Sequence, residues 1–452
     1  MFLHFIAIGG SAMHNLAIAL KKKGYTITGS DDEIVEPSAS RLAKYGLLPD
    51  KMGWDVNRIH RGLDGVILGM HARVDNPELL KALELGVKVY SYPEYIYEQS
   101  RQKKRVVIGG SHGKTTITSM VMHVLQANDQ DFDYLVGAQL AGFDTMVKIT
   151  EQAPVMIIEG DEYLASAIDR RPKFHLYHAD IGVISGIAWD HINVFPTFED
   201  YEKQFSIFID TITENGTLIY CKEDEELVKV VEESKNKISK VGYGVPDFII
   251  DNGKTYLLNG SEQVKLQVFG KHNLLNINAA KQVCAGLGIT GKQFYQAIQS
   301  FKGAARRLEL LGENQDTAVY KDFAHSPSKL KATLTAVKEQ YPGRELVAVI
   351  ELHTFSSLNE TFLKEYAHSM DSADVAIVYI DDHTFEHKKL KPYDENTVKQ
   401  AFANDRLNFF NNIKILERFL TTINHKGKNL LLMSSGSFSG MDLNNLTKEV
   451  LN

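Results

Sequence analysis

Cysteine is scarce in this chain: only Cys221 and Cys284 occur among 452 residues. Two isolated cysteines supply neither a disulfide framework nor a CxxC metal motif, so we interpret both as buried apolar residues. No apolar run reaches the 18 residues that a membrane-spanning helix needs, and the first residues lack the basic region and cleavage site of a signal peptide. These absences predict a cytoplasmic protein.

Positive charge is not in excess, because 50 Lys and Arg stand against 57 Asp and Glu, a formal net charge of -7. A nucleic-acid-binding protein is more often basic, so small-molecule partners are favoured over nucleic acid. The hydrophobic content of 44% is ordinary for a globular protein, and the length suggests two to four domains in a monomer or homodimer.

Strand and helix patterns alternate along the chain, which predicts α/β domains built on parallel sheets. We place one boundary in the polar segment 98–105 and another near Gly303, giving domains 1–102, 103–303 and 304–452. The stretch 216–268 is the most strand-like, with turn signals at Asn252-Gly253 and Asn259-Gly260. Further on, a helix is expected over 359–369, whereas 381–405 is polar and ambiguous.

The strongest local motif is the glycine-rich segment 109–116, which follows an expected strand and precedes an expected helix. Backbone N–H groups of such a loop converge on phosphate oxygens at a helix N-terminus. Lys114 can then reach the β- and γ-phosphates of ATP, and the Thr115 hydroxyl can bind Mg²⁺. The pattern is the shorter GxxGKT form, since Ile108 stands at the first glycine position. The predicted ATP-binding residues of the loop are Gly110, Ser111, His112, Gly113, Lys114, Thr115 and Thr116.

A second glycine turn, Gly9-Gly10-Ser11, follows the first expected strand, and Asp31 comes about 20 residues later. That spacing is typical of a dinucleotide site, in which the acid binds a ribose. A nicotinamide dehydrogenase is therefore an alternative, but it would have no use for the GKT loop. A uridine nucleotide at the first turn and ATP at the second explain both.

Acidic residues follow two strands of the central block. Glu159, Asp161 and Glu162 end one strand, and His191 lies just past another. Residues at the carboxyl ends of parallel strands face the ligand crevice, so we expect them near the phosphates held by Lys114. Oxygen-rich ligation there would suit Mg²⁺.

Seven segments resemble the Mur ligase family, in the family's order and over essentially the whole chain. They are IGGSAM, GGSHGKTT, EGDEY, WDH, FGKHNLLN, GAARRLE and KDFAHSP. The resemblance implies an N-terminal UDP-binding Rossmann-like domain, a central P-loop ATPase domain and a C-terminal Rossmann-like domain. It also implies an ATP-dependent, ADP-forming ligase that makes an amide through an acyl phosphate.

Site residues follow from the resemblance position by position. Lys114, Glu159, His191 and Arg307 are implied as catalytic, with Thr115, Glu159 and His191 on Mg²⁺. His272, Asn273, Arg307 and Asp322 are implied as further ATP contacts. Around the uridine nucleotide the implied residues are Gly9, Gly10, Ser11, Asp31, His71, Asp161 and Glu162.

The family branch indicated is the one that uses UDP-N-acetylmuramate. Within it, segments 70–78, 169–180 and 430–441 and Glu351 look more like ligases that attach the recycled peptide L-alanyl-γ-D-glutamyl-meso-diaminopimelate. The alternative is a ligase for L-alanine, which usually carries two arginines where this chain has Leu352–Ser357. The peptide ligases usually carry an arginine at the position of His353. A folylpolyglutamate synthase-like enzyme would lack residues 1–100, and a non-catalytic nucleotide-binding scaffold would not need the motifs present.

Overall fold

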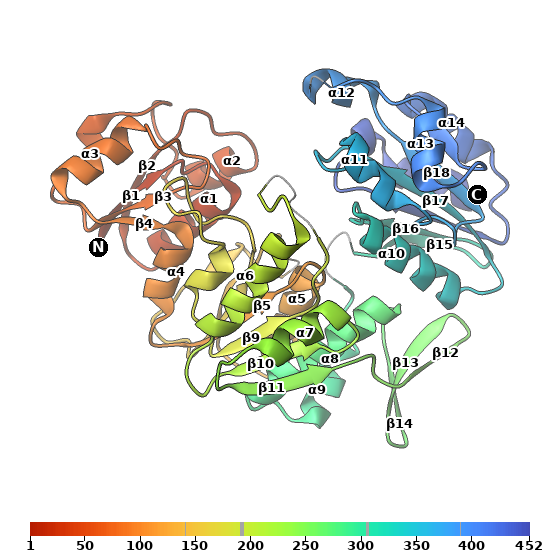
Figure 1. The fold of residues 1–452 in the computed structure, drawn as a ribbon, viewed down its shortest axis with the longest axis horizontal. Helices are drawn as coiled ribbons and strands as arrows, with labels where there is room; N and C mark the ends of the chain where they lie inside the picture. Colours follow the sequence, from red (N-terminus) through yellow and green to blue (C-terminus); the bar gives the residue numbers. More distant parts are fainter. Residues whose placement is uncertain (141, 190–193, 304–306, 389) are drawn as a thin grey trace. The chain divides into compact units, whose positions relative to one another are not determined.

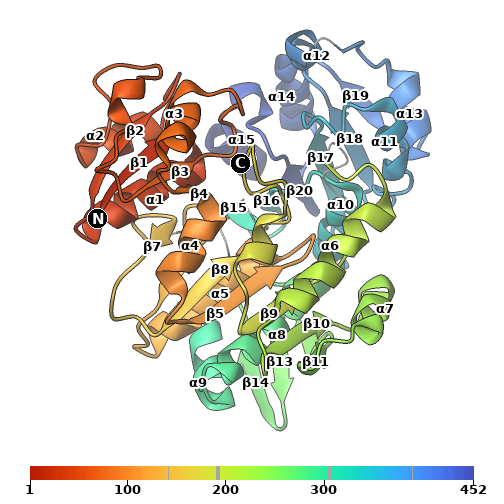
Figure 2. The same ribbon diagram turned by 60° about the vertical axis from the view of Figure 1, so that its left-hand side comes forward.

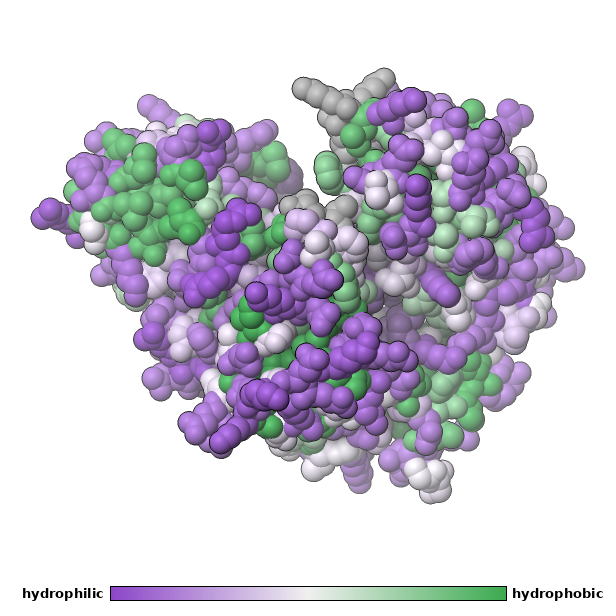
Figure 3. All heavy atoms as spheres, viewed as in Figure 1, coloured by the Kyte–Doolittle hydropathy of each residue, from purple (hydrophilic) through white to green (hydrophobic). Residues whose placement is uncertain are grey.

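The computed structural model describes residues 1–140, 142–189, 194–303, 307–388 and 390–452. The chain forms two compact units, Met1–Gly244 with Asn278–Ala297, and Val245–Ile277 with Ile298–Asn452. Figures 1 and 2 show the sheets and helices within each. The predicted α/β fold with three main sheets is confirmed: the first unit holds two of these sheets, and the second unit holds the third. Among the described residues no helix is both long and apolar enough to cross a membrane. Hydrophilic residues cover most of the face seen in Figure 3.

The first domain is a parallel four-stranded sheet in the order β2-β1-β3-β4. Its elements are β1 (Phe2–Ile6), α1 (Ser11–Lys22), β2 (Thr26–Ser30), α2 (Ser38–Lys44), η1 (Val56–Arg58), β3 (Gly65–Leu68), α3 (Pro77–Leu85), β4 (Val89–Ser91) and α4 (Tyr92–Ser100). The expected first strand ends at Ile6, because Ala7 adopts a left-handed φ of 66° and turns the chain toward α1. The glycine turn therefore lies at the carboxyl edge of β1, as expected.

The central sheet has seven strands in the order β11-β10-β9-β5-β8-β6-β7, all parallel except β7. Its strands are β5 (Lys104–Gly109), β6 (Asp133–Leu135), β7 (Val147–Lys148), β8 (Val155–Glu159), β9 (Ile181–Ile184), β10 (Thr217–Cys221) and β11 (Ser239–Tyr243). Its other elements are α5 (Lys114–Ala127), η2 (Lys173–Leu176), α6 (Phe198–Thr211), α7 (Glu225–Glu233), the latter part of α8 (Lys271–Gly286) and α9 (Gly291–Ile298). Helix α5 follows the glycine-rich segment as expected, and both cysteines are buried as expected.

The prediction that residues 216–268 are mostly strands was only partly right. Helix α7 interrupts it, capped by the Asp224 side chain, which accepts from the N–H of Leu227. Beyond it, β12 (Phe248–Asp251), β13 (Lys254–Asn259) and β14 (Glu262–Lys265) form an antiparallel meander. Its two turns fall at Asn252-Gly253 and Asn259-Gly260, as predicted. The meander belongs to the second unit, where Thr255 donates a hydrogen bond to Gln340.

The last domain is a six-stranded sheet in the order β15-β16-β20-β17-β18-β19, with β15 antiparallel to β16. Its elements are β15 (Glu309–Glu313), β16 (Ala318–Asp322), α10 (Pro327–Gln340), β17 (Glu345–Glu351), α11 (Glu360–Leu363), η3 (Lys364–Tyr366), β18 (Val375–Tyr379), α12 (Asp382–Lys388), α13 (Glu395–Phe402), β19 (Asn408–Phe410), α14 (Ile413–Thr422), β20 (Lys428–Met433), η4 (Phe438–Gly440) and α15 (Leu443–Leu451). The helix predicted over 359–369 was too long. It ends at Leu363, tightens into a 3₁₀ turn, and the chain leaves at Ala367 with an extended ψ of 128°.

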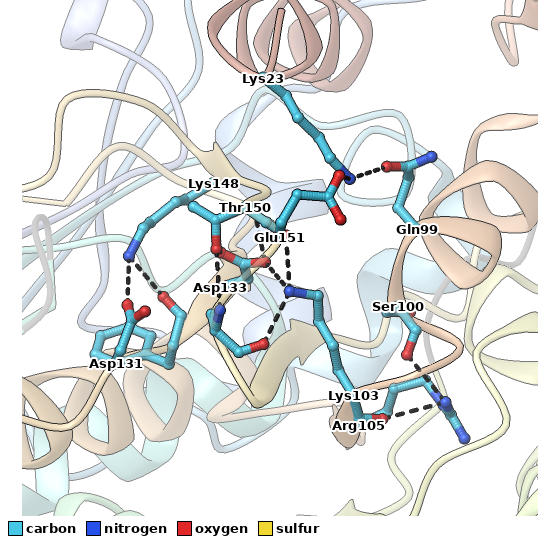
Figure 4. Close-up of polar contacts among 12 residues, drawn as sticks. Lys23, Gln99, Ser100, Lys103, Arg105, Asp131, Asp133, Lys148, Thr150 and Glu151 are labelled. Carbon is cyan, nitrogen blue, oxygen red and sulfur yellow. Dashed lines mark hydrogen bonds and ion pairs between the residues drawn. The ribbon is translucent and has the colours of Figure 1, made fainter. Parts of the chain in front are cut away.

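A buried ion pair anchors the start of the central domain, at its junction with the first domain (Figure 4). The Lys103 ammonium lies 2.8 Å from Asp133, with the two side chains 8% and 0% exposed. Lys103 also donates to the carbonyls of Thr150 and Ala153, and Asp133 accepts from the N–H and hydroxyl of Thr150. These contacts fix the start of β5, and with it the strand that leads to the glycine-rich loop.

Replacing Lys103 with Ala should lower the free energy of unfolding by about 3–5 kcal/mol, because it leaves the Asp133 carboxylate buried without its cation. Lys148→Ala is the matched control, since the Lys148–Asp131 pair in Figure 4 has side chains 40% and 54% exposed. It should cost about 0–1 kcal/mol. Urea denaturation measures both. Equal losses in the two variants would contradict this account of the junction.

Candidate active site

The glycine-rich loop joins β5 to α5 in the conformation that its sequence requires. Gly110 and Gly113 have φ angles of 115° and 77°, where an L side chain is strained. The Ser111 N–H donates to Gly186 at 3.0 Å, and the Ser185 N–H donates to Gly109 at 3.2 Å. The loop is thereby held against the segment that follows β9. Its N–H groups stand at the start of α5, where the helix dipole favours an anion.

Lys114 opens α5 and turns its ammonium back over the loop. It donates to the carbonyl of Gly110 at 2.7 Å and to the two carboxylate oxygens of Glu162 at 2.8 and 3.0 Å. The side chain of Glu162 is only 1% exposed. Burial alone would lower the pKa of Lys114, but the charges of Glu162 and Asp161 outweigh it and raise that pKa. Lys114 is therefore a cation at neutral pH.

Thr115 and Glu159 meet beside the loop. The Thr115 hydroxyl donates to one Glu159 oxygen at 2.8 Å, and the N–H of Gly137 donates to the other at 2.8 Å. Burial raises the pKa of Glu159, although both hydrogen bonds oppose the rise. The structure thus brings together two of the three predicted metal ligands. The third, His191, lies outside the described residues.

A hydroxyl and a carboxylate in contact, next to a phosphate loop, fit the oxygen ligation that Mg²⁺ prefers. When bound, Mg²⁺ would neutralise charge on the transferring phosphoryl group. Within the described part of the chain, no three His, Cys, Asp or Glu residues form a ready-made metal cluster. Mg²⁺ usually takes few protein ligands and completes its shell with phosphate oxygens and water.

Asp161 and Glu162 are adjacent in sequence but face different cations. The Asp161 carboxylate lies 2.6 Å from the ammonium of Lys173 and accepts from the N–H of Tyr163. Although burial opposes it, the charges of Lys173 and Lys114 lower the pKa of Asp161. The assignment of Asp161 and Glu162 to the uridine nucleotide remains a prediction.

The other residues predicted to bind the uridine nucleotide share the carboxyl edge of the first sheet. The Gly9 N–H donates to Asp31 at 2.7 Å, while Gly10 and Ser11 lead into α1. His71 is exposed and follows β3, the neighbour of β1. Burial raises the pKa of Asp31 to about 6, although the hydrogen bond from the Gly9 N–H acts to lower it.

The remaining predicted ATP contacts lie together in the second unit. Asp322 ends β16, and its carboxylate accepts from the N–H groups of Leu308 and Ala324 at 2.7 Å each. Burial lowers the pKa of His272; the charge of Asp322 opposes this shift, and the charge of Arg307 adds to it. The Asn273 side chain donates to the carbonyl of Phe269 at 2.9 Å. His272 and Asn273, predicted in the central block 103–303, thus belong to the same unit as Arg307 and Asp322.

Tyr201 is a residue of the loop environment that the sequence did not reveal. Its hydroxyl, on α6, lies 2.9 Å from Ser111 and 2.9 Å from Glu162. Tyr201 is fully buried, and in sequence it reads as one apolar position of an amphipathic helix. Its contact with the loop depends on how α6 packs against the central sheet, and this packing cannot be predicted from the local sequence.

Comparison with known proteins agrees with this geometry. Family descriptions match the chain over three ranges: the Mur ligase catalytic domain at 2–104, the Mur ligase middle domain at 108–284 and the Mur ligase glutamate ligase domain at 306–436. A UDP-N-acetylmuramate–L-alanine ligase of Sulfurihydrogenibium sp. (strain YO3AOP1) is 30% identical over 450 residues, 97% of this chain and 95% of the relative. The chain belongs to the Mur ligase family.

Two solved structures share the fold over nearly their full length. One is a UDP-N-acetylmuramate-alanine ligase from Thermotoga maritima, with a TM-score of 0.68, 21% identity, and coverage of 100% of this chain and 98% of that one. The other is a murein peptide ligase from Psychrobacter arcticus, with a TM-score of 0.64, 22% identity, and coverage of 100% and 99%.

Membership of this family fixes the class of reaction. Mur ligases are ATP-dependent, ADP-forming amide ligases that use Mg²⁺, so the predicted enzyme class and cofactors are confirmed. The middle-domain match includes the loop with Lys114 and Thr115, which excludes the alternative of a nicotinamide dehydrogenase.

Replacing Gly110 with Ala should weaken Mg·ADP binding about 10- to 100-fold, because the left-handed φ is strained for alanine. The added Cβ would also lie 2.7 Å from the backbone nitrogen of Ser185. Gly291→Ala is the control, since its Cβ would meet no atom within 4 Å. Isothermal titration calorimetry measures both. Unchanged affinity in Gly110→Ala would contradict the role of this loop.

Asp31 should give stability an unusual pH dependence. Its pKa is about 6 in the folded protein, against about 3.9 in an unfolded chain. The folded state therefore binds more protons in this range, so the contribution of Asp31 to stability falls as pH rises from about 4 to about 6. Asp31→Asn keeps an oxygen for the Gly9 N–H and removes the titration. The melting temperature of the variant minus that of the wild type should therefore increase between pH 5 and pH 7. If the two melting temperatures change in parallel with pH, the pKa of Asp31 is not raised.

Proposed function

We propose that this Mur ligase joins an amine to the lactyl carboxylate of UDP-N-acetylmuramate. The observation that carries the proposal is the cluster of Lys114, Thr115 and Glu159 around the glycine-rich loop, in a chain that also has a second glycine turn with Asp31. The first supports an ATP site, and the second supports a uridine nucleotide site at the carboxyl edge of a separate sheet.

The reaction proceeds through an acyl phosphate. A carboxylate oxygen of the muramate attacks the γ-phosphorus of ATP, and ADP leaves. The amine then attacks the acyl carbon, loses a proton, and inorganic phosphate leaves with that carboxylate oxygen. Both steps gather negative charge near the loop. The Lys114 ammonium and the loop N–H groups stabilise this charge without rearranging during the reaction. His272, Asn273, Arg307 and Asp322 are proposed as further ATP-binding residues.

The attacking amine is proposed to be that of an L-alanine residue. The curated relatives favour free L-alanine, because each one compared is a UDP-N-acetylmuramate–L-alanine ligase, at 29–32% identity. This was the alternative in the sequence prediction, and the comparisons support it better than the peptide.

A second candidate is the peptide L-alanyl-γ-D-glutamyl-meso-diaminopimelate, whose amine also belongs to L-alanine. A specific observation favours it. The side chain of Glu351 is 5% exposed and accepts hydrogen bonds from the N–H of Phe438 at 2.9 Å and from the hydroxyl of Ser434. Segments 351–357 and 434–440 therefore form one surface, at the carboxyl edge of the paired strands β17 and β20. Neither segment contains Lys or Arg. A free α-carboxylate is usually bound by such cations. In the tripeptide the alanine carboxyl group is an amide, and the remaining carboxylates lie farther from the reacting amine, so these segments need no cation beside it.

Phosphate release from ATP with UDP-N-acetylmuramate separates the candidates when L-alanine, L-alanine amide and the tripeptide are compared. If free L-alanine is the substrate, it should exceed both others by about 100-fold in kcat/KM, since the site then reads its carboxylate. A preference of that size for the tripeptide would establish the second candidate. No turnover with any of the three would contradict the proposed function.

A further inference from the structure

A buried carboxylate next to a phosphate loop is electrostatically unfavourable for nucleotide binding, yet Glu162 lies there. Both of its carboxylate oxygens contact Lys114, which is the residue expected to reach the phosphates. A lysine ammonium has three N–H donors. The contacts with Gly110 and the two oxygens of Glu162 account for three hydrogen bonds, so a phosphate oxygen must compete with Glu162 for Lys114.

Tyr201 links the same carboxylate to the loop backbone. The N–H of Ala188 donates to the Ser111 hydroxyl at 2.8 Å. That hydroxyl lies 2.9 Å from the Tyr201 hydroxyl, which donates to Glu162 at 2.9 Å. The single hydroxyl proton of Tyr201 is thereby directed at Glu162, and Ser111 donates to Tyr201. Hydrogen bonds arranged in this order polarise one another and stabilise the negative charge at their end.

The tyrosine ring is held in place by packing. Tyr201 is fully buried on α6, with the rings of Phe195 and Phe205 at 5.5 and 5.2 Å. Its hydroxyl therefore has a fixed position between Ser111 and Glu162. From the sequence, Glu162 was expected near the phosphates held by Lys114 and, by family resemblance, at the uridine nucleotide, whereas Tyr201 had no predicted role.

We propose that Glu162 and Tyr201 set the nucleotide affinity of the phosphate loop by controlling how strongly Lys114 is retained. Glu162 competes with the phosphates for the ammonium, and the Tyr201 hydroxyl weakens that competition by sharing the carboxylate charge. Tyr201 is a positioning residue, because it acts through Glu162. This inference rests on the proposed phosphate site and is independent of which amine is used.

The test is calorimetric titration of the full chain with Mg·ADP. Glu162→Gln should tighten binding about tenfold, because it removes the charge that holds Lys114. Tyr201→Phe should weaken binding about threefold, because Glu162 then retains Lys114 more strongly. In the double variant the Tyr201 effect should vanish, since it requires the Glu162 charge. Tyr320→Phe, which removes a buried hydroxyl bonded to Tyr341, is the matched control and should leave the affinity unchanged.

A merely structural role predicts a different pattern. Both single variants would then weaken binding, and their effects would add in the double variant; that result would overturn the inference, as would unchanged affinity in both. If the wild type does not bind Mg·ADP at all, the proposed phosphate site fails and the inference fails with it. If the wild type binds and the variants differ as expected, a negative ligation assay would count against the proposed substrates alone.

Discussion

The structure depends on keeping the Lys114 ammonium charged and in place among carboxylates. Burial works against this charge, and the acids of the segment 159–162 restore it. The same acids would repel a nucleotide if they stood alone. The backbone N–H groups of the loop and the N-terminus of α5 attract an anion and so oppose this repulsion. The Thr115 hydroxyl donates to Glu159 and shares its charge. Under our proposal, the Lys114 ammonium can then exchange the Glu162 carboxylate for a phosphate.

Positioning of that loop depends on the central sheet. Strand β5 lies between β8 and β9, so the loop, the acid segment after β8 and the segment after β9 all emerge at one edge. The buried Lys103–Asp133 pair fixes the start of β5, and the hydrogen bonds of Ser111 and Ser185 fix its end. The first domain repeats the principle on a smaller sheet, where Asp31 after β2 meets Gly9 after β1.

Sequence reasoning succeeded where a local constraint determines the structure. Gly110 and Gly113 need left-handed backbone, so the glycine pattern alone predicted the loop and the start of α5 at Lys114. Helix α7 was missed although its signals were present: a capping Asp224 and buried Leu227, Val230 and Val231 at helical spacing. These helix signals were overlooked because the sequence on both sides of them is typical of strands.

Contacts between distant elements could not be predicted in this way. Nothing local indicates that Tyr201 reaches Ser111, 90 positions earlier, or that Glu162 turns toward Lys114 while Asp161 turns toward Lys173. The same holds for Glu351, whose hydrogen bonds to Ser434 and Phe438 depend on the pairing of β17 with β20. The amine preference, which we propose that this surface sets, was correspondingly the weakest part of the sequence interpretation.

The central claim is that this site activates a carboxylate by phosphorylation. It is tested most directly with UDP-N-acetylmuramate labelled with ¹⁸O in its lactyl carboxylate, by mass spectrometry of the phosphate released during ligation. The account predicts that one labelled oxygen is transferred to each inorganic phosphate, because the carboxylate oxygen forms the bond to phosphorus. Unlabelled phosphate accompanying amide formation would contradict it.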